Sequence, residues 1–101
     1  MDRPRIYVDF NEMLEPDLVL LARLDTVKDS SGAVVHLQEG TPVCVYMDDL
    51  GDDGAPDNLI ADGVAERNVT TGWGASVAWC CRIGEAGIRH ESDIGDHHDP
   101  C

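Results

Sequence analysis

The sequence is poor in basic residues, poor in aromatic residues and without long apolar runs, and these shortages exclude several classes of function. Only seven Lys and Arg stand against 20 Asp and Glu among 101 residues, which gives a formal net charge of −13. Such a chain is repelled by phosphate backbones, so we expect no direct binding to nucleic acid. No apolar run approaches the ~20 residues that a membrane-spanning helix needs, so we expect no membrane contact.

The amino-terminal segment and the cysteines indicate where the protein works. Asp9 interrupts the short apolar stretch after the first basic residues, which is not the pattern of a secretory signal. Of the four cysteines, Cys80 and Cys81 are adjacent and Cys101 is terminal, which is not the spacing of a disulfide framework. We therefore expect a cytoplasmic protein whose cysteines are thiols.

Short segments of alternating apolar and polar residues, separated by Gly and Pro, predict strands. The segment 16–24 is compatible with a short helix or a strand, because it is too short for its periodicity to decide. Gly63, inside one expected strand, predicts a bulge or a bend. Residues 85–87 predict a hairpin turn. The expected strands cover residues 5–10, 26–28, 33–37, 43–47, 58–67, 75–83 and 88–90.

These segments predict an all-β fold, mainly antiparallel, arranged as a small barrel or a compact sandwich of six or seven short strands. The stretch 37–84 resembles small barrels of the SH3-like and KOW-like types, in which turn glycines such as Gly40 and Gly63 precede β-rich or curved strands. The resemblance implies an SH3-like barrel. The whole chain is also similar to short proteins that are common in bacterial genomes. Neither resemblance implies an activity, because one fold hosts many functions.

The chain is expected to form one β-rich domain, residues 1–92, followed by a flexible acidic tail, residues 93–101, that carries histidine and cysteine. Alternation along the expected strands predicts the core. Its expected members are Ile6, Val8, Phe10, Val43, Val45, Leu59, Val64, Val77, Trp79 and Ile83.

An acidic stretch follows the strand at 43–47 and invites a calcium hypothesis, because hard cations need several oxygen ligands. The candidate ligands are Asp49, Asp53 and Asp57. The EF-hand pattern fails, since Gly51 and Ile60 stand where that pattern needs oxygen ligands. Without a cation, we expect mutual repulsion to raise the pKa of these carboxyl groups.

Other residues suggest zinc binding or nucleophilic catalysis, with weaker patterns. Adjacent cysteines on a strand point to opposite faces, so Cys80 and Cys81 cannot readily bind one zinc ion together with His90, His97, His98 and Cys101. Residues 90–93 hold the residue types of a hydrolase triad, but neighbours in sequence do not form its geometry. We find no catalytic motif and expect neither enzyme activity nor a cofactor.

The function that we expect is non-catalytic binding of a protein or peptide, with a basic partner favoured by the charge. The expected contact residues are Trp73, which lies between two glycines, Tyr46, Asp49 and Asp53. One alternative is a structural or regulatory protein that binds calcium or zinc. Another is a nucleic-acid mimic that inhibits a basic partner.

Overall fold

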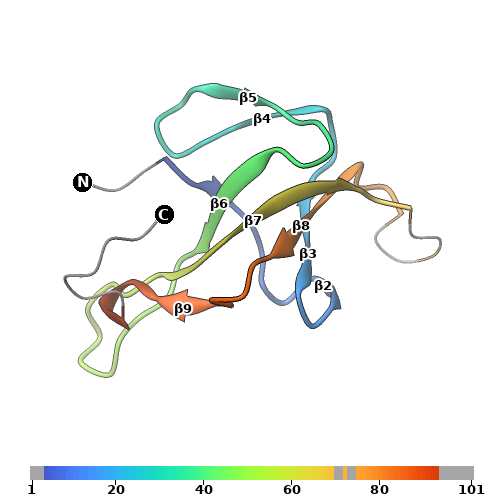
Figure 1. Cartoon of the computed structure of the whole chain (residues 1–101). Helices are drawn as coiled ribbons and strands as arrows, with labels where there is room; N and C mark the ends of the chain where they lie inside the picture. Colours follow the sequence, from blue (N-terminus) through green and yellow to red (C-terminus); the bar gives the residue numbers. More distant parts are fainter. Residues whose placement is uncertain (1–3, 70–71, 73–74, 94–101) are drawn as a thin grey trace.

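The computed structural model in Figure 1 describes residues 4–69, 72 and 75–93. Its described part is all-β, apart from one 3-10 turn, η1 (Glu91–Asp93). The strands are β1 (Ile6–Tyr7), β2 (Met13–Glu15), β3 (Leu18–Ala22), β4 (Thr26–Lys28), β5 (Val34–His36), β6 (Pro42–Met47), β7 (Leu59–Arg67), β8 (Trp79–Ile83) and β9 (Arg89–His90). Residues 94–101 of the expected tail lie outside the described residues.

Seven strands form one curled sheet, and β4 and β5 form a separate two-stranded sheet. The order in the larger sheet is β1-β6-β7-β8-β3-β2, with β9 paired to β7. Only the β1–β6 pair is parallel among the pairings of the described strands. The predicted all-β, mainly antiparallel class is therefore confirmed. No helix in the part of the chain that the structure describes is long and apolar enough to cross a membrane.

The ambiguous segment 16–24 contains a strand and not a helix. Leu18, Val19, Leu20 and Leu21 are all buried on β3, which lies between β2 and β8. Val19 and Leu21 belong to the main core, whereas Leu18 and Leu20 belong to a second small cluster on the other face. A continuous apolar run is typical of a strand that is covered on both faces.

The main core lies on the concave face of the sheet and includes six of the residues expected from alternation. These are Ile6, Val8, Val43, Val45, Trp79 and Ile83. Phe10 packs against this core, and Val77 packs against the second cluster. Leu59 is only half-buried. The prediction for Val64 was wrong, because its neighbour Ala65 faces the core and Val64 is 37% exposed on the opposite side.

Gly63 permits a close approach of two strands and does not form the alternative bulge. Gly63 pairs with Val43 of β6 on one side and with Ile83 of β8 on the other. Neither of the two strand pairings has a shift in register. A Cβ atom at Gly63 would lie 2.2 Å from the carbonyl oxygen of Arg82 and 2.7 Å from the Cys81 sulfur. The absent side chain therefore lets β8 approach β7 where the sheet curls.

The expected hairpins differ in outcome. The β4–β5 hairpin is confirmed, with Gly32 at a φ of 86° that favours glycine. The turn at 85–87 does not make a hairpin, because β9 pairs with β7 through Leu59 and His90 instead of returning along β8. This pairing brings the chain after β9 beside the end of the β6–β7 hairpin (Figure 1).

Candidate functional site

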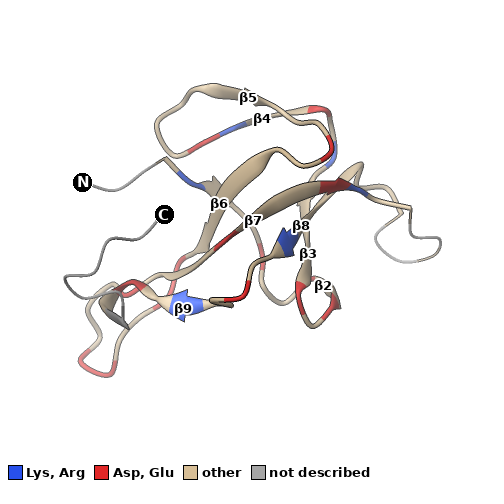
Figure 2. Ribbon diagram, in the orientation of Figure 1, with Lys and Arg blue, Asp and Glu red and all other residues tan. Residues whose placement is uncertain are grey.

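The acidic stretch 48–58, which we call the acidic tip, is the hydrogen-bonded end of the β6–β7 hairpin. The Asp57 N–H donates to the Asp49 carbonyl at 2.9 Å, and the Gly51 N–H donates to the Ala55 carbonyl at 2.8 Å. Figure 2 shows acidic residues gathered on this end of the molecule. The sequence indicated a loop, but backbone hydrogen bonds across the stretch close it as an ordered hairpin end.

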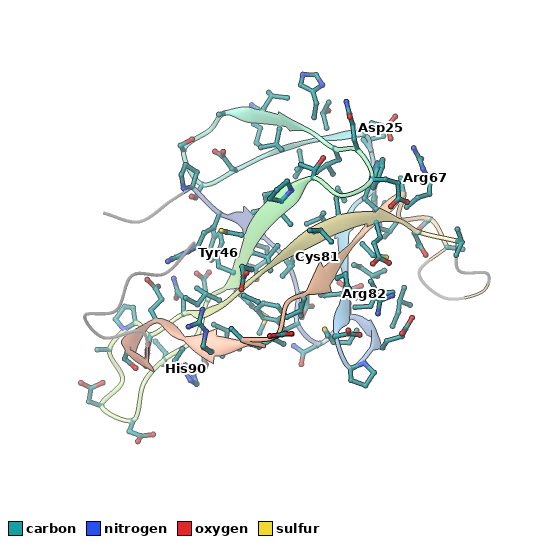
Figure 3. The ribbon with its side chains drawn as sticks, viewed as in Figure 1. Asp25, Tyr46, Arg67, Cys81, Arg82 and His90 are labelled. Carbon is teal, nitrogen blue, oxygen red and sulfur yellow. The ribbon has the colours of Figure 1, made fainter. Side chains whose placement is uncertain are left out.

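Residues 90–92, which we call the clasp, hold the acidic tip from one side. The His90 Nε2 lies 2.8 Å from Asp49 Oδ2. The Ser92 hydroxyl donates to Asp57 Oδ2 at 2.7 Å, and the Ser92 N–H donates to Asp57 Oδ1 at 3.0 Å. The Glu91 N–H donates to the Asn58 carbonyl. The clasp begins at His90, the last residue of β9, so the pairing of β9 with β7 positions it (Figure 3).

The hydrogen bonds of the clasp lower the pKa of two carboxyl groups. The bond from His90 lowers the pKa of Asp49, helped by the Leu50 N–H. The Ser92 hydroxyl and N–H lower the pKa of Asp57, whereas the charge of Asp49 raises it by less. The expected rise from mutual repulsion is therefore wrong for both groups, because hydrogen bonds to the ionised forms outweigh it.

An open groove of about 580 Å³ lies between the acidic tip and the clasp. It carries four carboxylates and no Lys or Arg among the described residues that line it. Glu91, one of these four, pairs with the buried Arg5 at 3.2 Å, and Arg5 does not line the groove. The lining residues are Gly51, Asp52, Asp53, Ala55, Pro56, Asp57, Glu91 and Ser92. The negative charge that lines this groove attracts cationic groups.

The expected contact residues are only partly brought together. Asp53 lines the groove and Asp49 is held by His90 beside it. Tyr46 lies on β6, away from the lining, with its ring 5.4 Å from the Tyr7 ring in an edge-on arrangement. Trp73 lies outside the described residues. The structure adds Leu50, which is 63% exposed on the acidic tip.

The described residues offer no cluster of ligands that supports the calcium or zinc hypothesis. The part of the chain that the structure describes holds no group of three or more His, Cys, Asp or Glu arranged to bind a metal ion. Asp53 Oδ1 accepts the Ala55 N–H at 3.0 Å. Cys81 lies in the main core and Cys80 in the second cluster, so the adjacent cysteines do face opposite ways. His97, His98 and Cys101 lie outside the described residues.

The nucleophilic side chains have unreactive surroundings. Burial raises the pKa of the Cys81 thiol to about 12 and also raises that of Cys80. Cys44 is disulfide-bonded, contrary to the expectation that the cysteines are thiols. Ser92 donates to Asp57 while His90 contacts Asp49, so these two side chains belong to separate carboxylate pairs.

Sequence reasoning missed the clasp and its support from Arg5. A strand of two residues, β9, carries no periodic signal, and the contacts join residues that are distant along the chain. Residues 90–93 stand out in the sequence by their residue types alone, and nothing in the sequence places them beside the acidic tip.

The chain matches no protein-family model, no curated protein and no solved structure.

Proposed function

We propose that this protein is a non-catalytic interaction module of the small-barrel type that binds a basic segment of a protein or peptide. The observation that carries the proposal is the groove between the acidic tip and the clasp. Asp52, Asp53 and Asp57 gather there beside Glu91, which pairs with Arg5, and the described lining contains no Lys or Arg. Lys and Arg side chains are the complementary groups, because charge-assisted hydrogen bonds to carboxylates are about twice as strong as neutral ones.

The backbone of the acidic tip supports this function by limiting the cost of binding. The Gly51–Ala55 and Asp49–Asp57 bonds hold the hairpin, and the clasp adds bonds from its side. A binding surface that is already ordered loses less conformational entropy when a partner arrives. The ordered backbone of the acidic tip therefore favours recognition of a segment with a defined spacing of positive charges.

Leu50 supplies an apolar contact within the same surface. It is 63% exposed on a tip that is otherwise rich in acids. Interfaces depend on a few well-packed side chains, while surrounding charges mainly set specificity and the rate of encounter. We infer that the partner presents an apolar pocket or side chain flanked by basic residues.

The test is a binding measurement against a library of Lys- and Arg-containing peptides, with the highest-affinity peptide taken forward to titration. The double variant Asp52→Asn with Asp53→Asn removes two charges from the groove. We expect it to weaken binding by about tenfold, which corresponds to about 1.4 kcal/mol. Leu50→Ala should weaken binding as well, with less dependence on salt.

The matched control is Glu12→Gln with Glu85→Gln, which removes the same charge from exposed positions outside the groove. We expect at most about a twofold loss, through the reduced long-range field alone. Equal losses for the two double variants would show a non-specific attraction to net charge and would reject the groove as the site.

A further inference from the structure

The larger sheet curls but does not close, and it leaves a gap between β1 and β3 that we call the seam. The sheet ends at β1 on one side and at β2 on the other. Because β2 pairs with β3 only at Leu18 and Val19, the rest of that edge of β3 has no strand beside it among the described strands. An open hollow of about 260 Å³ lies in the seam. Its described lining residues are Tyr7, Val8, Asp9, Glu12, Leu20, Leu21, Ala22, Arg23 and Val77.

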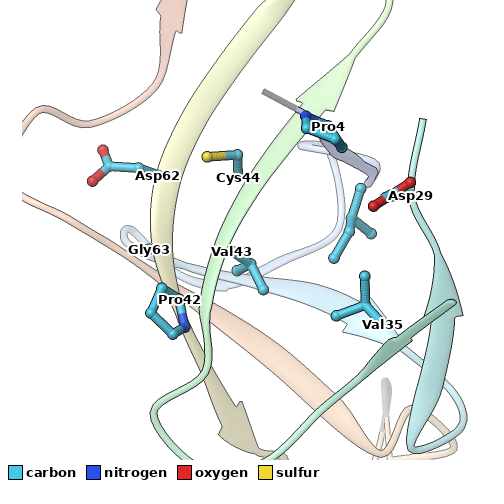
Figure 4. A pocket seen from close by; sticks show the side chains of 9 residues that line it. Pro4, Asp29, Val35, Pro42, Val43, Cys44, Asp62 and Gly63 are labelled. Carbon is cyan, nitrogen blue, oxygen red and sulfur yellow. The ribbon is translucent and has the colours of Figure 1, made fainter. Parts of the chain in front are cut away.

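The seam interrupts one sheet and does not separate two. Val8 and Leu21 lie in the main core on the concave face, whereas Leu20 belongs to the second cluster on the other face. A hollow that is lined from both faces lies in the plane of the sheet, where a further strand would pair. A larger cavity, of about 310 Å³, lies between β6 and the β4–β5 sheet, with Val43 and Val35 on its two sides (Figure 4). That cavity is a space between two sheets and does not offer the same place to a strand.

The backbone of β1 points toward the seam at Tyr7. The Val8 N–H donates to the Tyr46 carbonyl at 2.9 Å. In a parallel ladder, alternate residues of a strand bond to the same neighbour. Ile6 and Val8 therefore direct their backbone groups to β6, and the N–H and C=O groups of Tyr7 point to the opposite side. These groups are the donor and the acceptor that an edge strand offers to another chain.

The backbone of β3 points toward the seam at Leu20. The Ile83 N–H donates to the Asp17 carbonyl at 2.7 Å, so alternation along β3 directs the backbone groups of Val19 to β8. Leu20 then faces the other way, and its N–H donates to the Glu12 carbonyl at 3.2 Å. The Leu20 carbonyl points to this same side. Two strand edges with outward backbone groups therefore border the hollow.

The charges at the seam indicate which kind of chain it accepts. Asp9, Glu12 and Arg23 line the hollow, so it carries both signs, unlike the acidic tip, and does not select a basic segment. A second copy of this chain, with a net charge of −13, is repelled. The chain's own residues 94–101 hold two Asp and Pro100, which suit an apolar strand ladder poorly.

We propose that the seam binds an uncharged, extended apolar segment of another protein, which pairs with β1 and β3 and continues the curled sheet. Backbone hydrogen bonds to Tyr7 and Leu20 hold such a segment, and pockets for its alternate side chains give specificity. On one face these side chains meet Val8 and Leu21, and on the other they meet Val77. The pairings make β1 and β3 antiparallel to each other, so the segment is parallel to one and antiparallel to the other.

The experiment titrates the isotope-labelled full chain with the synthetic peptide acetyl-Thr-Val-Ile-Val-Thr-amide and follows the backbone amides by NMR. We expect the Tyr7 N–H to exchange with solvent at least about tenfold more slowly at saturation, because it gains a hydrogen bond. The amide of Asp57, on the acidic tip, should not respond. The same peptide with N-methyl groups on its central residues keeps the side chains but lacks the donors, and should bind at least about tenfold more weakly.

Two variants at one position test the backbone group itself. Tyr7→Pro removes the N–H that faces the seam, and proline is tolerated on an edge strand where the N–H is outside the ladder. Tyr7→Ala is the matched control, because it removes the ring and keeps the N–H. Binding is read from the amide shifts of Val8 and Leu21. We expect a loss of at least about tenfold for Tyr7→Pro and of less than about threefold for Tyr7→Ala.

The outcomes separate the seam from the groove and from other occupants. Asp52→Asn with Asp53→Asn should change binding of this uncharged peptide by less than about twofold, so failure here leaves the test of the groove unaffected. Equal losses for the two Tyr7 variants, or equal binding of the N-methylated peptide, would overturn the proposal. Slow exchange of the Tyr7 N–H in the free dilute protein would show that the chain itself fills the seam. Protection that grows with protein concentration would show a second copy there, and either result would also overturn the proposal.

Discussion

Strand β7 has different surroundings at its two ends. At its carboxy-terminal end, the Arg67 guanidinium lies 4.3 Å from the centre of the Trp79 ring, and the Arg67 N–H donates to Glu39 Oε1 at 2.7 Å. The Trp79 Nε1–H donates to Asp25 Oδ1 at 2.8 Å. At the amino-terminal end, the strand leads from the acidic tip, whose bonds to the clasp are largely exposed.

The two ends of β7 therefore serve different roles, one in the stability of the fold and the other in binding a partner. At the Trp79 end, the Trp79 ring is only 2% exposed, so its apolar area is buried. A cation and carboxylates surround the ring and compensate each other's charge. The acidic tip carries a surplus of one charge and little buried area. We infer that the Trp79 end contributes much of the folding free energy and that the acidic tip remains available for a partner.

The largest expected effect is at the Trp79 end. Trp79→Ala should lower the free energy of unfolding by about 3–5 kcal/mol, because it empties a large buried site and leaves the Asp25 carboxylate without its indole donor. Denaturant unfolding followed by circular dichroism measures the change. Leu50→Ala on the acidic tip is the counterpart and should change stability by no more than about 0.5 kcal/mol. Similar losses for the two variants would refute the division between the ends.

A smaller loss is expected in the middle of the strand. Gly63→Ala places a methyl group against the backbone of Arg82, which cannot move unless β7 and β8 separate. Overpacking of this kind costs about 1–3 kcal/mol. Gly84→Ala is the matched control, because its added Cβ would have its nearest contact at 3.5 Å, an ordinary distance. We expect thermal unfolding to show a clearly lower midpoint for Gly63→Ala alone.

Acidification should lower the stability of the protein at the acidic tip, through Asp49 and Asp57. Their pKa values in the folded protein lie below the ordinary value near 3.8, so the folded state binds these protons more weakly than the unfolded state. The stabilisation that these two carboxylates give the folded state is therefore present above their pKa in the unfolded chain. It is lost as the pH falls through their lower pKa in the folded protein. We expect the melting temperature to decrease below about pH 4.

Variants assign that decrease to the clasp. Asp49→Asn with Asp57→Asn should flatten the dependence of the melting temperature on pH in this acidic range. Asp52→Asn should not, because Asp52 makes no hydrogen bond or ion pair with the described residues. A dependence that is unchanged in the double variant would contradict a role for the clasp in acid stability.

The sequence predicts the elements in which local pattern and tertiary packing agree. Val43 and Val45 alternate with half-buried residues on β6, and Gly32 supplies the positive φ of the β4–β5 turn. The pattern misleads on β7, where the concave face carries the small residues Ala61 and Ala65. Alternation then favours the larger Val64, which faces outward, because local periodicity does not reveal how closely a neighbouring strand approaches.

The site is less predictable than the fold, for a different physical reason. Composition locates the surplus of acids at the acidic tip, but the contacts that arrange them come from His90 and Ser92 on a distant segment. Those residues are positioned by β9, whose two residues pair with β7 instead of β8. Such a pairing is determined by the curled sheet as a whole, so no local motif carries it.

The smallest expected effect concerns screening of the surplus charge. The Debye length falls from about 30 Å at 0.01 M to about 10 Å at 0.1 M salt, so repulsion among exposed carboxylates weakens over that range. Because the net charge is −13, we expect sodium chloride to raise the melting temperature slightly at neutral pH. Calcium chloride at matched ionic strength should give a similar rise, since no described group of three ligands can hold the ion. A much larger rise with calcium, lost in Asp49→Asn with Asp53→Asn, would instead make the acidic tip a cation site and displace the basic partner proposed here.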